Sequence, residues 1–125
     1  MGEADMPPLT KTFQDDSKSE NIFLSSINLI KTRLAKNLRI NLNETLLVYC
    51  AYIVNELRCG KSIVSITNNA KKILSTDNVM IGVPESIRKL SFDVLLDNNP
   101  KVTITLDEPI PTSDYILLPN NTKQV

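Results

Sequence analysis

One stretch near the middle of the chain constrains the fold more than any other. The sequence at 46–54 reads LLVYCAYIV, nine apolar residues without a charge. Asn41 and Glu44 have the N-x-x-E spacing of a capping box, and Gly60 can terminate a helix, so a helix is predicted over about 42–59. One face would carry Leu42, Leu46, Tyr49, Cys50, Ile53 and Leu57, and the other Leu47, Val48, Ala51 and Val54. A helix that is apolar nearly all round needs cover on all sides, which indicates a partner surface.

The same run is too short to cross a membrane. A transmembrane helix needs about 20 consecutive apolar residues. The first ten residues, MGEADMPPLT, carry acidic residues and prolines where a signal peptide has a basic stretch and then an apolar one. We therefore expect a cytoplasmic protein with no membrane partner.

Composition narrows the classes of function. Lys plus Arg and Asp plus Glu each number 14, and this zero net charge argues against a nucleic-acid partner. The chain has no His, the commonest acid–base catalyst and the commonest transition-metal ligand. Cys50 and Cys59 would lie about 13 Å apart along one helix, too far for a disulfide. We expect two reduced thiols and no catalytic, cofactor-binding or metal site in this chain.

Helical periodicity predicts further helices around the apolar one. A first helix is expected over about 20–36 from apolar residues spaced four, three and four: Phe23, Ile27, Ile30 and Leu34. Ser62 can cap a third helix over 63–74. Its inner face would carry Ile63, Ile66, Ala70 and Ile73. Ser75 can cap a short fourth helix over 76–81, and residues 1–18, which show no apolar period, are expected to form a mobile arm.

Two strands are expected after the helices. Apolar residues alternate with polar ones at Leu90, Phe92, Val94 and Leu96, and again at Val102, Ile104 and Leu106. The cluster DNNP at 97–100 predicts the turn of an antiparallel hairpin. The predicted fold class is α+β, an N-terminal bundle of about four helices followed by a C-terminal antiparallel β-hairpin. We expect one domain over 19–110 and a C-terminal extension over 111–125.

Three candidate motifs are better explained as structural features than as binding or catalytic sites. Gly60, Lys61 and Ser62 resemble the end of a phosphate-binding loop, but neither the earlier glycine nor the preceding strand is there. The helices at 43–59 and 62–74 resemble a helix-turn-helix, which the zero net charge disfavours. No spacing defines a catalytic carboxylate pair among Asp93, Asp97, Asp107 and Glu108.

The segment VMIGVPESI at 79–87 predicts a corner between the helices and the hairpin. Gly82 can take the left-handed conformation that ends a helix. Pro84 pushes Val83 towards extended backbone and suits the first position of a new turn, with Glu85 at its positive end. Gly82 and Pro84, like the terminator Gly60, are therefore expected to be structural joints.

Four segments together resemble the urease gamma-subunit family. They are LAKNLRINLNET at 34–45, ELRCGKSI at 56–63, LSTDNVMIGVPESI at 74–87 and VTITLDEPI at 102–110. Their order is collinear over 22–110, and the string VM-x-GVPE-x-I is the most specific part.

The resemblance implies a non-catalytic structural subunit of urease, the nickel enzyme that hydrolyses urea to ammonia and carbamate. It places the nickel in a partner alpha subunit and implies assembly with alpha and beta subunits, as a trimer of alpha–beta–gamma units. The candidate interface residues are Leu47, Val48, Tyr52, Val83 and Pro84.

The chain also departs from the family pattern. Cys59 stands where an aspartate is usual, and Leu106 where many members have a histidine. These departures affect the details of subunit contacts. Two other functions stay open at this point: a stand-alone helical interaction module with no link to urea, and a small enzyme in its own right.

Overall fold

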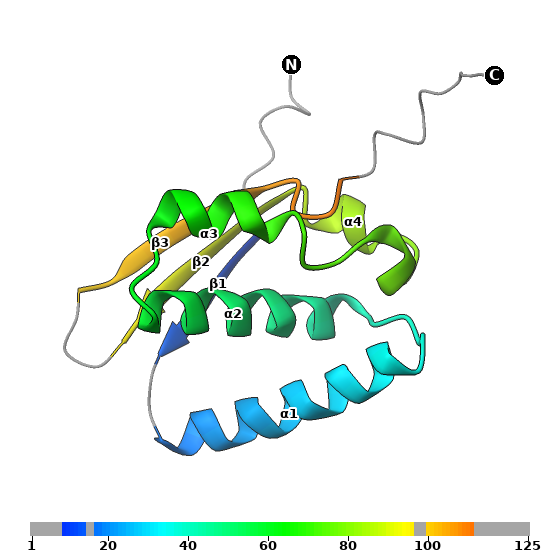
Figure 1. The fold of residues 1–125 in the computed structure, drawn as a ribbon, viewed down its shortest axis with the longest axis horizontal. Helices are drawn as coiled ribbons and strands as arrows, with labels where there is room; N and C mark the ends of the chain where they lie inside the picture. Colours follow the sequence, from blue (N-terminus) through cyan, green and yellow to red (C-terminus); the bar gives the residue numbers. More distant parts are fainter. Residues whose placement is uncertain (1–8, 15–16, 97–99, 112–125) are drawn as a thin grey trace.

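The computed structural model describes residues 9–14, 17–96 and 100–111. Along the described chain, one strand precedes the helices and two strands follow them (Figure 1). In order, the elements are β1 (Leu9–Gln14), α1 (Ser17–Ala35), α2 (Leu42–Arg58), α3 (Ile63–Ala70), the 3₁₀ turn η2 (Thr76–Asn78), α4 (Val83–Ser86), β2 (Lys89–Leu95) and β3 (Val102–Asp107). The predicted α+β class is confirmed, with helices followed by C-terminal strands.

The sheet contains one strand more than the sequence predicted. Its order is β1-β2-β3, with β2 antiparallel to β3, as expected, and parallel to β1. The prediction of a mobile arm over 1–18 is therefore wrong for β1, where Leu9 pairs with Leu90 and Phe13 with Val94. The remainder of that arm before 17, most of the hairpin turn and the C-terminal extension beyond 111 lie outside the described residues.

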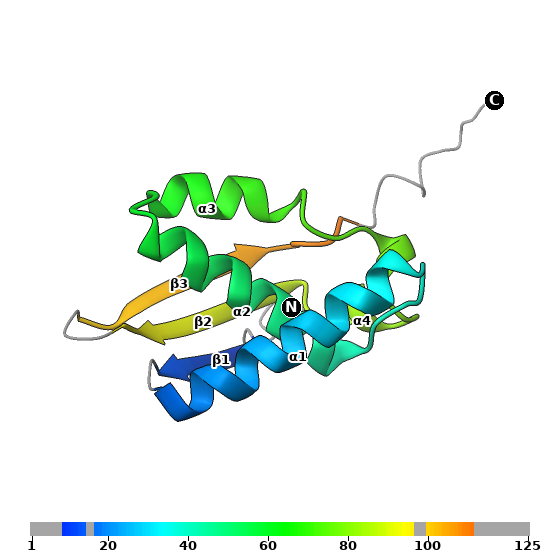
Figure 2. The same ribbon diagram turned by 60° about the horizontal axis from the view of Figure 1, so that its bottom comes forward.

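One face of the sheet is apolar and the other is polar. In register, Leu90 lies between Leu9 and Leu106, while Asp93 lies between Thr12 and Thr103. The apolar row faces the helices, which gather on one side of the sheet (Figure 2). On the other face, the Thr103 hydroxyl donates to Asp93 Oδ1 at 2.7 Å.

Helix α2 is the central helix and runs between α1 and α3 in both views (Figures 1 and 2). The predicted capping box is present, since Asn41 and Glu44 each accept a hydrogen bond from the other's backbone N–H. The helix ends at Arg58, and Gly60 follows with φ 79°, the left-handed conformation expected of a terminator. Two tyrosine hydroxyls tie α2 to other elements. Tyr49 donates to the Pro109 carbonyl at 3.3 Å and Tyr52 to the Ile66 carbonyl at 2.8 Å.

The predicted helices at 63–74 and 76–81 are shorter in the structure. Ser62 caps α3 as expected, but α3 ends at Ala70 and the chain turns over 71–73. Helix propensity is a weak prior that tertiary contacts override. Here the turn brings the buried Leu74 back into the core. Ile63, predicted to face inwards, is 48% exposed.

In the corner at 79–87, Gly82 has the expected conformation but a different place relative to the helices. Gly82 has φ 93°, but it precedes helix α4 instead of ending a helix. Val83 begins α4 and Pro84 is the second helical residue, so the predictions of an extended Val83 and of Pro84 at the first position are wrong. Both side chains are buried. A residue before proline normally avoids helical backbone, and the burial of both side chains outweighs this preference at Val83.

Candidate functional site

The two sides of helix α2 differ in how completely this chain covers them. Tyr49 and Ile53 are 0% exposed in the core. On the other side, Val48, Ala51 and Tyr52 are only partly buried. The sequence predicted that an apolar helix would need cover all round, and the structure leaves this outer side incompletely covered among the described residues.

An apolar groove of about 530 Å³ lies over this outer side. Its floor is formed by Val48, Ala51 and Tyr52 of α2. Helix α1 supplies one wall with Leu24, Ile27, Lys31 and Leu34, and Ile73 and Leu74 supply another. We call this the α1–α2 groove. Two of the five residues predicted at a subunit interface, Val48 and Tyr52, therefore line one continuous hollow.

A second groove, of about 290 Å³, lies between α2 and strand β1. Leu46, Leu47 and Cys50 line it from α2, and Phe13 lines it from β1. Leu47, the third predicted interface residue, belongs to this groove. The structure does not bring it together with Val48 and Tyr52.

The remaining two predicted interface residues lie inside the chain. Val83 is 5% exposed and Pro84 is also buried, so both side chains contribute to the subunit's own core. The large apolar side chains that the corner exposes are ones that the sequence analysis did not select. Ile81 is 95% exposed, and its neighbour Met80 is 46% exposed. A large apolar side chain directly before a left-handed glycine was the available signal.

The corner is held in place by the loop that enters α2. The Met80 N–H donates to the Ile40 carbonyl at 2.9 Å, and the Ile40 N–H donates to the Asn78 carbonyl at 3.0 Å. Ile40 and Val79 form an isolated parallel bridge and are almost fully buried. The exposed Ile81 therefore projects from a backbone that is fixed on the side facing the core.

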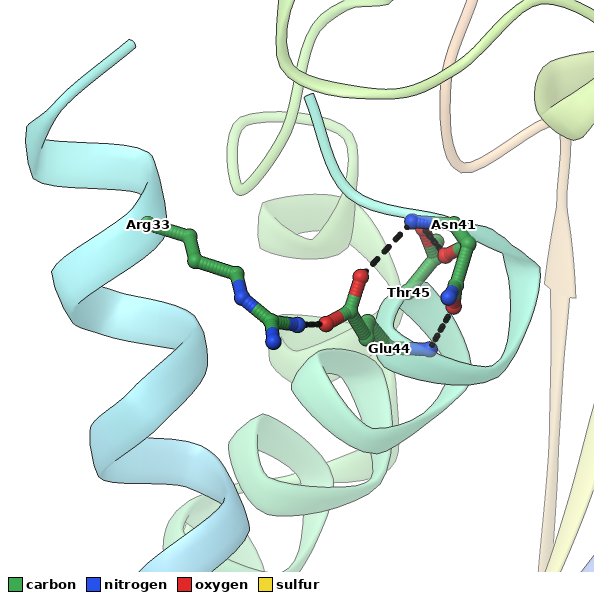
Figure 3. Close-up of polar contacts among 4 residues, drawn as sticks. All are labelled: Arg33, Asn41, Glu44 and Thr45. Atoms are coloured by element: carbon green, nitrogen blue, oxygen red, sulfur yellow. Dashed lines mark hydrogen bonds and ion pairs between the residues drawn. The ribbon is translucent and has the colours of Figure 1, made fainter. Parts of the chain in front are cut away.

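The same loop is locked to α1 at the start of α2 (Figure 3). One carboxylate oxygen of Glu44 accepts from the Asn41 N–H at 2.9 Å, and the other pairs with the Arg33 guanidinium. The Thr45 hydroxyl donates to the Asn41 carbonyl at 2.8 Å. Glu44 thus connects the loop and α2 to α1, and these two helices form the α1–α2 groove.

Comparison with known proteins identifies the family. Residues 14–110 match the family model described as urease, gamma subunit. A curated relative, urease subunit gamma of Halalkalibacterium halodurans, is 31% identical over 94 residues, which cover 74% of this chain and 93% of the relative.

The chain belongs to the urease gamma-subunit family.

The family assignment bears out the resemblance read from the sequence, and it makes the surfaces described above candidate contacts within a urease. The structural joints of this gamma-family chain, Gly60 and Gly82, both have positive φ. Leu106, one of the two departures from the family pattern noted in the sequence, is 1% exposed on the apolar face of the sheet. It therefore belongs to the core of this chain.

Urease implies nickel, and the donor groups in the described part of this gamma-family chain do not fit that metal. The sequence has no His. Within 9–14, 17–96 and 100–111, no group of three or more His, Cys, Asp or Glu side chains is placed to hold a metal ion. No step of urea hydrolysis is therefore assigned to residues of this chain.

Burial raises the pKa of the tyrosine and buried cysteine side chains of α2. Both cysteines are free thiols, as predicted, with Cys50 buried and Cys59 exposed. Burial raises the pKa of the Cys50 thiol to about 12, so it stays protonated at neutral pH. Burial, and secondarily the carboxylate of Glu56, raises the pKa of Tyr52. No helix in the described part of the chain has the length and apolar character to span a membrane.

Proposed function

We propose that this chain is a non-catalytic structural subunit that assembles with the alpha and beta subunits of a urease. The observation that carries the proposal is the match of residues 14–110 to the gamma-subunit family. The absence of His from the sequence and the partly covered outer side of α2 support it. The alternative of a stand-alone interaction module has no comparison in its favour.

In the assembly that we propose, the chemistry belongs to a partner. The alpha subunit would hold the nickel and hydrolyse urea to ammonia and carbamate in the cytoplasm. This chain would supply apolar surface from the outer side of α2 and from the corner at Ile81. The expected complex is a trimer of alpha–beta–gamma units.

Co-expression with the alpha and beta chains tests the proposal. We expect all three chains to elute together in size-exclusion chromatography, and the complex loaded with nickel to hydrolyse urea. The isolated chain should show no turnover. An active alpha–beta complex that forms without this chain and excludes it when it is added would contradict the proposal.

Assembly through the corner can be tested in the same system. Ile81→Asp should leave the unfolding midpoint of the isolated chain unchanged, because a side chain that is 95% exposed adds little to the core. It should reduce the share of this chain that elutes with its partners. Val64→Asp, at an apolar residue of α3 that is 68% exposed, provides the control substitution.

A further inference from the structure

Most of the described residues that line the α1–α2 groove belong to the two helices, and Phe13 of β1 and Ile73 and Leu74 after α3 complete the lining. On α2, Val48, Ala51 and Tyr52 follow one another at helical spacing. On α1, Leu24, Ile27 and Leu34 form a parallel stripe ten residues long, which corresponds to about 15 Å. The groove is therefore an open trough about three helical turns long.

Helical walls favour a helical occupant. An extended segment pairs its backbone groups with the exposed edge of a sheet, whereas this groove presents mainly side chains of α1 and α2. A strand lying there would leave buried N–H and C=O groups without partners. A helix satisfies its own backbone and can set ridges of side chains between those of α1 and α2.

The described residues that line the groove carry charges of one sign. Lys31 and Arg58 line it, and none of the described lining residues is acidic. Lys31 is exposed and stands on α1 beside the apolar stripe. A partner that buries apolar side chains here would place its flanking polar residues near Lys31, and a carboxylate is the group that this ammonium would favour.

We propose that the α1–α2 groove binds an amphipathic helix of a partner urease subunit, with apolar anchors on one face and carboxylates beside that face. This inference rests on the proposed function, because it names the face through which the structural subunit is held. It commits to a partner helix, and a second copy of this chain in the groove would contradict it.

Photo-crosslinking in the assembled complex tests the occupant. We would incorporate p-benzoylphenylalanine at position 51, in the floor of the groove, and separately at position 64, where Val64 is 68% exposed on α3. The expected result is a cross-link from position 51 to a helical peptide of the alpha or beta chain that contains Asp or Glu, and none from position 64 to that peptide. A cross-link to an extended or basic segment, to a second copy of this chain, or to nothing would overturn the inference.

Charge reversal tests the recognition of carboxylates. Lys31→Glu should weaken association with the partner subunits by about tenfold, since like charges placed together across an interface are costly. Lys71→Glu, an exposed lysine after α3 that does not line the groove, should leave association unchanged. Replacing the cross-linked partner carboxylate with lysine should restore binding of Lys31→Glu.

The outcomes separate this inference from the proposed function. Equal unfolding midpoints of Lys31→Glu and the wild type would show that the variant folds. If the wild-type chain joins an active complex while Lys31→Glu binds as well as Lys71→Glu, only the groove inference fails. If the wild-type chain never joins its partners, the proposed function fails and the inference with it.

Discussion

Helix α2 and the corner at 79–87 are held in place by different kinds of interaction. In α2, the side chains of Tyr49 and Ile53 are fully enclosed. In the corner, Gly82 adopts a left-handed conformation and Ile81 is almost fully exposed. The position of α2 depends on side-chain volume, whereas the corner combines buried side chains with hydrogen bonds to the backbone of Ile40 and a left-handed glycine. Substitutions should therefore act through packing in α2, and through backbone strain at Gly82 in the corner.

The largest effect is expected from removing volume inside α2. Ile53→Ala should lower the free energy of unfolding by about 2–5 kcal/mol, because it deletes three buried carbons from a fully enclosed site. Val48→Ala, on the partly covered outer side, should cost less than about 1 kcal/mol. Urea denaturation followed by circular dichroism measures both. Equal losses would show that the two sides of α2 are covered alike.

Backbone strain in the corner should produce the next largest effect. A Cβ at Gly82 would meet nothing within 4 Å, so the cost of Gly82→Val comes from its φ of 93°. That cost should be about 1–2 kcal/mol. Gly60→Val, also at positive φ with open space around it, should cost a similar amount. Pro84→Ala should be milder, about 0.4–1 kcal/mol. Thermal unfolding of the three variants checks this order, and equal tolerance of Gly82→Val and Pro84→Ala would contradict it.

Alkaline pH should weaken the packing of α2. The Cys50 thiol titrates near 12 in the folded chain against an ordinary value of 9.0, so between these values the folded state binds a proton that the unfolded state has lost. The free energy of unfolding therefore falls as pH rises through this window, by about 1.4 kcal/mol at pH 10. Tyr49, whose pKa is also raised by burial, adds to the loss above its ordinary value of 10.0.

Urea titrations at pH 7, 9 and 10 measure this dependence. Cys50→Ala should remove the part that begins near pH 9, because it removes the titrating group. Cys59→Ser, at the exposed thiol, should follow the wild type. An unchanged pH dependence in Cys50→Ala would show that another group is responsible.

The smallest effects are expected at the N-terminus of α2, next to the loop that pairs with the corner. Asn41→Ala removes the acceptor for the Glu44 N–H and should cost about 1 kcal/mol. Glu44→Gln keeps an acceptor for the Asn41 N–H but loses the charge paired with Arg33, and should cost about 0.2–1 kcal/mol. Only the second loss should shrink at high salt. The exposed Asn43→Ala is the control, and a cost equal to that of Asn41→Ala would contradict the cap assignment.

Features set by neighbouring residues could be predicted from the sequence. The capping box of Asn41 and Glu44 depends on a spacing of three residues, and the left-handed Gly82 depends on the absence of a side chain. The antiparallel hairpin follows from two alternating runs on either side of a turn cluster. Each of these signals is complete within a short window.

Features set by distant contacts could not be predicted in this way. Strand β1 has only two apolar residues, Leu9 and Phe13, and its partner strand is most of the chain away. The candidate site shows the same division. Exposure at Ile81 and burial at Val83 and Pro84 depend on how the corner packs on the rest of the chain, which no local pattern reveals. The groove between α1 and α2 likewise depends on how two helices pack, and not on either helix alone.

Because β1 pairs with β2, the sheet cannot form until both strands have been synthesised. Leu9 leaves the ribosome early, but its partner Leu90 follows only about 80 residues later. At about 5–20 residues per second, the first strand waits roughly 4–16 s before its neighbour exists. Until then the apolar side of β1 is not packed beside β2, and the groove between α2 and β1 is incomplete. The subunit is therefore ready for its partners only when nearly all of its domain has been synthesised.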